Sequence, residues 1–69
     1  MREYITNTVN QLRTERSITQ EALAKGVGVS RQTIVAIEKG DYTPSVLLAL
    51  KFSSFFDVPV EKIFSISHE

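Results

Sequence analysis

The chain has 69 residues, enough for one small domain that buries about 60% of the surface its unfolded form exposes. It has no cysteine, which excludes a disulfide framework and a thiolate metal site, so a small apolar core must supply its stability. Eight Lys and Arg residues balance eight Asp and Glu residues, and a net charge of zero gives no general attraction to nucleic acid.

Short alternating segments lie near the two ends of the chain, EYI at residues 3–5 and FSIS at residues 64–67. Alternation of apolar and polar residues is typical of a strand with one covered face. We expect the two segments to pair as an antiparallel ribbon.

A first helix is predicted from residue 7 or 8 to residue 16. Val9 and Leu12 recur there on one helical face. Thr6 or Asn7 can accept hydrogen bonds from the free backbone N–H groups at its start.

Two more helices follow, each with a capping residue at its start. Thr19 offers a hydroxyl cap, and Glu21 places a carboxylate in the first turn, so a second helix is predicted over residues 20–25. Ser30 caps the stretch RQTIVAIEK, and Gly40 supplies the left-handed position that commonly ends a helix.

The fourth helix is predicted to start at Pro44, with Thr43 before it, and to end near Phe56. Pro59 can open a short fifth helix through VEKIF. The fourth helix is expected to be largely buried because its apolar set is broad, namely Val46, Leu48, Leu50, Phe52 and Phe55.

Five helices in this length leave only short connections, as in a compact domain. The fold expected is therefore all-α, a single domain over residues 1–69 with a two-stranded ribbon made from the termini.

The connection between the second and third helices has residues whose size fits a tight turn. Ala24 lies where two helices must approach closely, and Gly28 lies where the turn needs a positive φ. Val29, Ile34 and Ile37 are placed to pack into the core.

With these residues in place, the sequence resembles the lambda-repressor-like, or Xre-type, helix-turn-helix family of DNA-binding regulators. The resemblance covers QLRTERSITQEALA, GVSRQTIVAIEKGDYTPS, LALKF and VPVEKIF. It implies a compact five-helix DNA-binding domain, with the helix-turn-helix at about residues 19–39, and the short stand-alone form of the family. The partner it implies is double-stranded DNA.

In this family the second helix of the motif enters the major groove, which is wide enough to admit it. The residues that would then meet base edges are Ser30, Arg31, Gln32, Val35 and Ala36. Arginine can pair with guanine O6 and N7, glutamine with adenine N6 and N7, and small apolar side chains can touch a thymine methyl.

The resemblance also implies contacts to phosphate. Gln20 is similar to the family glutamine that clamps the backbone at a helix N-terminus. Arg13 and Glu38 resemble a partly buried ion pair, with Arg13 also able to face phosphate. The remaining phosphate candidates are Thr19, Thr33, Lys39, Tyr42 and Thr43.

Four apolar residues exceed what one small core is expected to cover: Leu47, Phe56, Val60 and Ile63. A leftover apolar patch on a small domain usually marks a partner surface, so we expect a homodimer through the fourth and fifth helices. Two-fold symmetry would then place two recognition helices about 34 Å apart on an inverted-repeat operator.

Three positions depart from the family pattern. Gly26 should fray the end of the second helix by up to about 1 kcal/mol relative to alanine. Asp41 lies in a loop that often carries basic residues and would repel phosphate. Asp57 replaces a frequent glycine, although Asp tolerates a left-handed conformation better than most residues.

An enzyme is not expected, because His68 is the only histidine and no carboxylate pair or glycine-rich phosphate loop is present. No cofactor, metal or small-molecule ligand is evident. The apolar runs are too short to span a membrane, and MREYITNT lacks the apolar core of a signal peptide, so we expect a soluble cytoplasmic protein.

The function expected is a dimeric, sequence-specific transcriptional regulator, more readily a repressor because no activating surface or effector domain is evident. The alternative is a protein-interaction module of the same fold, an antitoxin or co-regulator, that acts mainly through a partner protein.

Overall fold

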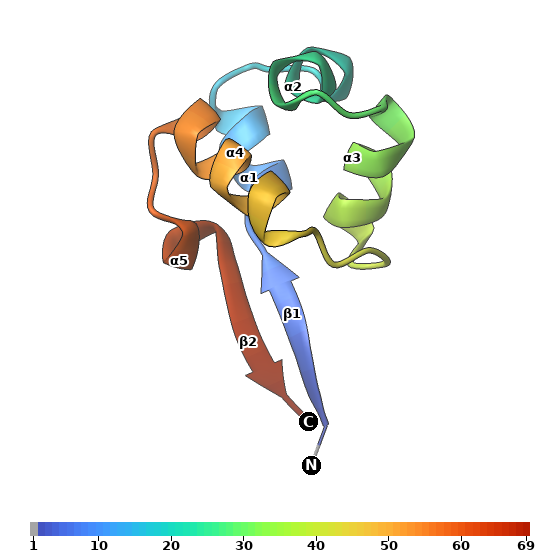
Figure 1. The fold of residues 1–69 in the computed structure, drawn as a ribbon, viewed down its shortest axis with the longest axis vertical. Helices are drawn as coiled ribbons and strands as arrows, with labels where there is room; N and C mark the ends of the chain where they lie inside the picture. The colour runs from blue at the N-terminus through green and yellow to red at the C-terminus, as the bar shows by residue number, and fades with distance from the viewer. Residues whose placement is uncertain (1) are drawn as a thin grey trace.

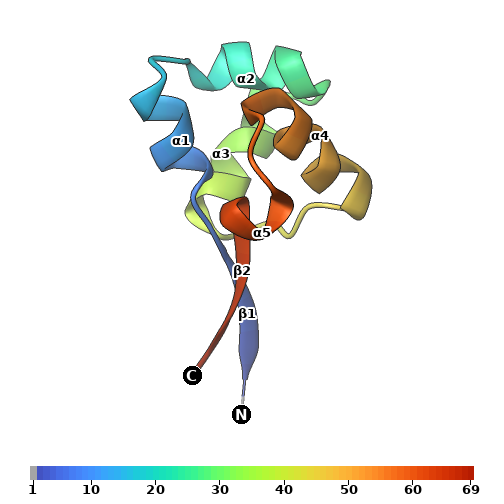
Figure 2. The ribbon, with the colours of Figure 1, turned by 90° about the vertical axis from the view of Figure 1, so that its left-hand side faces the viewer.

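The computed structural model describes residues 2–69, in which a helical body carries a projecting ribbon. The ribbon extends along the longest dimension of the molecule, and β1 begins where β2 ends, at its far tip (Figures 1 and 2). None of the helices in this part of the chain has both the length and the apolar character needed to cross a membrane. In chain order the elements are β1 (Glu3–Asn7), α1 (Val9–Glu15), α2 (Gln20–Val27), α3 (Arg31–Lys39), α4 (Val46–Phe56), α5 (Val60–Ile63) and β2 (Phe64–His68).

The ends of α2 and α3 are fixed by the residues that the sequence predicted. The hydroxyls of Thr19 and Ser30 each accept a hydrogen bond from the backbone N–H three residues later, at 3.0 and 3.2 Å. Gly28 and Gly40 end the two helices with φ of 76° and 83°. Each hydroxyl cap stabilises its helix by about 1 kcal/mol.

The start of α4 differs from the prediction by two residues. The cap is Ser45 rather than Thr43, and its hydroxyl accepts from the N–H of Leu48 at 3.1 Å. Pro44 lies before this cap instead of in the first turn. At the other end Asp57 adopts a left-handed conformation with φ of 56°, which an aspartate tolerates better than most residues.

The core is centred on the ring of Phe52. This ring stacks on Phe56 with centroids 6.4 Å apart and meets Phe64 at 5.8 Å in a tilted arrangement. All five helices contribute buried side chains, which joins them into one apolar cluster: Val9, Leu23, Ala24, Val27, Ile34, Ile37, Leu48, Phe52, Phe56 and Ile63.

Two residues expected at a dimer interface belong to this core instead, so that part of the prediction was wrong. Phe56 is 0% exposed and Ile63 is 1% exposed. The Phe56 ring packs edge-on to Phe55, and the guanidinium of Arg16 covers it at 5.4 Å from the centroid. The small core therefore covers more apolar surface than composition suggested.

The opposite error concerns α4, which was expected to be largely buried. Val46 and Leu50 are 77% and 55% exposed, and Leu47 between them is 64% exposed. Apolar residues occur on every side of this helix, so periodicity did not show which side faces inward. The buried side is the one with Leu48 and Phe52.

The predicted ribbon is confirmed. β1 and β2 pair antiparallel, with Ile5 opposite Ile66 and Asn7 opposite Phe64. The side-chain amide of Asn7 donates to the carbonyl of Ile37 in α3 at 2.9 Å, which ties the base of the ribbon to the helical body.

Gly26 has a steric role that the sequence analysis missed. The predicted fraying of α2 does not occur, since the helix continues through Val27. A Cβ at Gly26 would lie 2.2 Å from Cε2 and 2.7 Å from Cδ2 of Phe55. Glycine is needed here because the aromatic ring packs directly against the α2 backbone.

We expect Gly26→Ala to destabilise the protein by about 1–3 kcal/mol, because overpacking against the Phe55 ring outweighs alanine's helix preference of about 1 kcal/mol. Urea unfolding followed by circular dichroism measures this change. The same substitution in a Phe55→Ala background removes the clash and should be stabilising. Stabilisation by Gly26→Ala in the unaltered chain would contradict the steric account.

Candidate nucleic-acid interface

The turn between α2 and α3 sets the angle at which α3 leaves the body. Gly28 takes the left-handed conformation, and the next N–H, from Val29, donates to the carbonyl of Ala24 at 3.0 Å. A Cβ at Gly28 would meet only Lys51 Nζ at 3.8 Å, so glycine is required by φ rather than by space. Ala24 is 3% exposed, and its small side chain permits close packing of the two helices.

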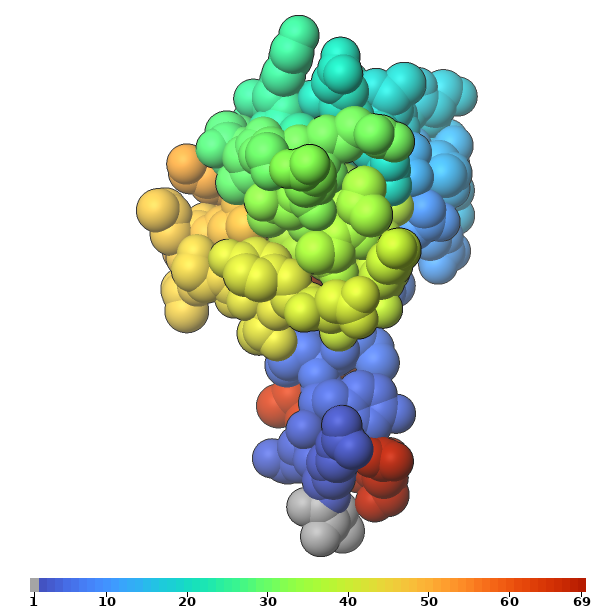
Figure 3. All heavy atoms as spheres, turned by 90° about the vertical axis from the view of Figure 1, so that its right-hand side faces the viewer, coloured from blue at the N-terminus to red at the C-terminus, as the bar shows by residue number. Residues whose placement is uncertain are grey.

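The two sides of α3 have opposite environments. Ile34 and Ile37 are 0% exposed and anchor the helix to the core. Arg31 and Gln32 are exposed, and their side chains make no hydrogen bond within residues 2–69. Figure 3 looks onto this side, with α3 across the middle, α2 above it and the segment after α3 below. The polar end of α3 is therefore free to contact a partner.

The remaining base-contact candidates are less available than Arg31 and Gln32. Val35 and Ala36, in the second turn of α3, are half-buried. The Ser30 hydroxyl caps the helix and also hydrogen-bonds the Thr33 hydroxyl at 3.1 Å. Ser30 thus stabilises the end of the helix that presents Arg31.

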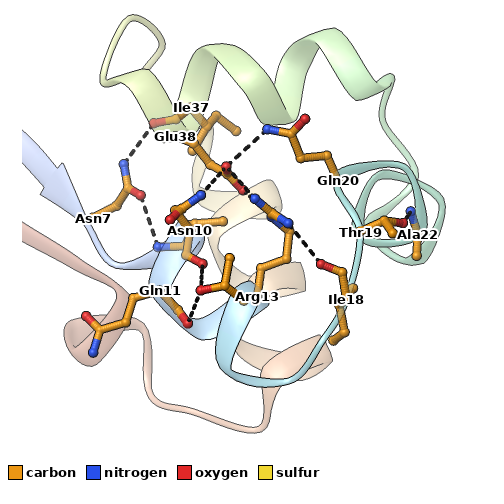
Figure 4. Close-up of polar contacts among 12 residues, drawn as sticks. Asn7, Asn10, Gln11, Arg13, Ile18, Thr19, Gln20, Ala22, Ile37 and Glu38 are labelled. Carbon is orange, nitrogen blue, oxygen red and sulfur yellow. Dashed lines mark hydrogen bonds and ion pairs between the residues drawn. The ribbon is translucent and has the colours of Figure 1, made fainter.

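A network around Glu38 joins three helices (Figure 4). Arg13 of α1 donates from Nε to Glu38 Oε2 at 2.7 Å and from a terminal nitrogen to Oε1 at 3.1 Å. Asn10 of α1 and Gln20 of α2 donate to the same Oε1 at 3.0 and 3.2 Å. Glu38 therefore fixes α3 against both preceding helices.

The ion pair within this network is largely removed from solvent, with side-chain exposures of 12% for Arg13 and 6% for Glu38. Burial alone would raise the pKa of the Glu38 carboxyl, but hydrogen bonds from Arg13, Asn10 and Gln20 outweigh it and hold that pKa below its ordinary value. The hydrogen bond to Glu38 raises the pKa of Arg13. Both groups are charged at neutral pH.

The structure argues against Arg13 as a phosphate contact. Its guanidinium donates to Glu38 and also to the carbonyl of Ile18 at 2.9 Å, so all three nitrogens have partners inside the domain. Gln20 is different, because its amide has two N–H groups and only one is used by Glu38. The second N–H is available to an acceptor beside the start of α2.

The other phosphate candidates lie around α3. Thr19 caps α2 and Thr33 bonds Ser30, so both hydroxyls already have local partners. Lys39, Tyr42 and Thr43 are exposed at the end of α3 and in the segment that follows it. Asp41 is exposed among them and opposes their attraction to an anion.

Asn10 is a site residue that sequence reasoning missed. It lies three positions before Arg13, so the two share one face of α1, and this spacing was the available signal. Within residues 2–69, no group of three or more His, Cys, Asp or Glu side chains is placed to hold a metal ion.

Residues 9–63 match a family model described as Helix-turn-helix. The chain is 55% identical to an uncharacterised HTH-type transcriptional regulator of Methanocaldococcus jannaschii, over 84% of this chain and 88% of that protein. It is 49% identical to the uncharacterised HTH-type transcriptional regulator YgzD of Bacillus subtilis, over 91% and 96% of the two chains.

Two further similarities involve more specific descriptions. The cryptic phage CTXphi transcriptional repressor RstR of Vibrio cholerae is 37% identical over 83% of this chain and 51% of its own length. The crystal structure of the restriction-modification controller protein C.AhdI from Aeromonas hydrophila superposes with a TM-score of 0.73 at 28% identity, covering 78% of this chain and 82% of that one. The latter agreement confirms the lambda-repressor-like fold.

We expect Glu38→Gln to reduce the free energy of unfolding by on the order of 3 kcal/mol, because it leaves the buried Arg13 guanidinium without a counter-charge. Since the folded-state pKa of Glu38 is lowered, its contribution is present above the ordinary glutamate pKa and is lost as pH falls through the lowered value. Urea unfolding from about pH 7 to about pH 3 should show this acid dependence in the native chain and a weaker one in Glu38→Gln.

Glu15→Gln is the matched control. Glu15 is exposed on α1 and hydrogen-bonds only Gln11 at 3.2 Å. This substitution should change stability by less than about 0.5 kcal/mol. Equal effects of the two substitutions would rule out a special role for Glu38.

Proposed function

The chain belongs to the helix-turn-helix family of DNA-binding transcriptional regulators, and from this premise we propose that it is a homodimeric repressor that reads an inverted-repeat operator through the major groove. This membership places it among regulators and not among enzymes. The observation that carries the finer proposal is the exposed, unpaired polar end of α3, Arg31 and Gln32, opposite a fully buried face.

Base recognition is assigned to the first two turns of α3. The major groove of B-DNA is about 12 Å wide and admits a helix. Arg31 can donate two hydrogen bonds to guanine O6 and N7, and Gln32 can pair with adenine N6 and N7. Val35 and Ala36, half-buried one turn later, offer apolar contact to a thymine methyl.

Phosphate contacts are assigned to the edges of the same surface. The free N–H of Gln20 and the N-terminal backbone of α2 form one site, where the helix dipole favours an anion. Lys39, Tyr42 and Thr43 form the other, beyond the end of α3. Because Glu38 holds both Gln20 and α3, these contacts keep a fixed distance from the base-reading residues.

Repression is supported by the similarity to RstR, which is named a transcriptional repressor. A two-fold dimer would place two α3 helices about one turn of DNA apart, as an inverted repeat requires. Leu47 and Val60, expected at a dimer surface, lie outside the buried core and stay available for one. Since its target is DNA, we assign the protein to the cytoplasm.

Selection of bound sequences from a random DNA duplex pool tests the proposal. We expect the native protein to recover an inverted repeat. Arg31→Ala and Gln32→Ala should each lose preference at particular base pairs and weaken binding to the recovered site by about 1–3 kcal/mol, because each removes a bidentate contact. Fluorescence anisotropy with labelled duplexes at fixed salt measures the affinities.

Lys62→Ala is the control for loss of positive charge, since Lys62 is exposed on α5 rather than α3. It should leave the base preferences unchanged. Failure of the folded native protein to enrich any sequence would contradict the operator proposal and favour the interaction module. That module would tolerate changes at Arg31 and Gln32.

A further inference from the structure

An apolar hollow opens where the first turn of α4, α5 and the base of the ribbon meet. These three parts lie together at the junction of the helical body and the ribbon (Figure 1). The cavity is about 120 Å³, and its apolar lining comes from Ile5, Pro44, Val46, Ala49, Val60 and Phe64. No charged residue lines it in the described part of the chain.

Apolar surface continues outward from this hollow on two sides. Val46, on its rim, is 77% exposed, the largest exposure among the large hydrophobic residues described. Across the ribbon, Ile66 lies opposite Ile5 on the same face and is 64% exposed. A projecting valine thus stands beside a hollow of matching apolar character. A continuous patch of this kind usually marks a protein contact.

The size of the hollow argues against a small-molecule ligand. Pockets that bind such ligands commonly measure about 300–1,000 Å³. A space of 120 Å³ suits a single inserted side chain instead. Because Val46 and the hollow are adjacent on one surface, a two-fold axis beside them would insert Val46 of each copy into the hollow of the other. Such self-complementarity is what an isologous interface requires.

We propose that a second copy of this chain occupies the hollow, with Val46 and Val60 at the centre of the contact and Ile66 at its edge. This inference rests on the homodimer of the proposed function and specifies its surface. The hollow includes no residue of α2 or α3, so a partner seated there leaves Arg31, Gln32 and the start of α2 uncovered.

The other flank of α4 is less suitable for this contact. Leu47 is 64% exposed there, but it lines a different hollow that includes Lys51, Tyr42 and residues of the turn between α2 and α3. A partner on that flank would bury a lysine charge. It would also lie against the turn that positions α3.

Neighbouring substitutions on α4 separate the two flanks. Val46→Asp should weaken dimerisation at least about 30-fold, because it places a charge at the centre of the contact. Leu47→Asp, one position away and similarly exposed, should change the dimer dissociation constant less than about 3-fold. Sedimentation equilibrium measures the constants, and Ile66→Asp is expected to have an intermediate effect. Circular dichroism melts check folding, and Val46→Ala is a milder second variant.

Each outcome bears on the proposal. Loss of the dimer in Leu47→Asp but not in Val46→Asp, or in neither variant, overturns it. A native chain that is monomeric both alone and on its selected DNA overturns it as well, and would favour a different protein as the occupant. A native dimer disrupted by Val46→Asp supports the surface even if no DNA sequence is enriched, in which case only the operator proposal fails.

Discussion

The carboxylate of Glu38 is the point on which the geometry of α3 depends. It accepts hydrogen bonds from α1 through Arg13 and Asn10 and from α2 through Gln20, so one buried anion sets the positions of three helices. Desolvation opposes its charge, and the surrounding donors offset that cost. The network also links Gln20, at the start of α2, to the helix that carries Arg31.

The helix-turn-helix combines strongly fixed residues with free ones. Ile34 and Ile37 are fully buried, and Gly28 takes a conformation that few residues accept. Arg31 and Gln32, on the same helix, have no partner among residues 2–69. Rigid support below unpaired donors reduces the entropy lost when a helix binds in a groove. The same framework can therefore present different side chains at these positions.

Local chemistry explains which features could be predicted from the sequence. Thr19, Ser30 and Gly40 act within one helical turn, and the structure has each in the predicted role. Phe56, Ile63 and Val46 were misplaced because periodicity shows that a helix has apolar positions without showing which neighbour covers them. Gly26 was misjudged for a related reason: its partner, Phe55, lies on another helix, and helix propensity carries no information about it.

The ribbon has a consequence for the order of folding. The hydroxyls of Thr6 and Ser67 lie 3.4 Å apart but 61 positions apart in the chain, so the two strands meet only by closing a long loop. Contacts between distant segments form slowly compared with those between successive helices. The helical body should therefore assemble first and bring the strands together afterwards, and on unfolding the tip of the arm should open before the helices separate.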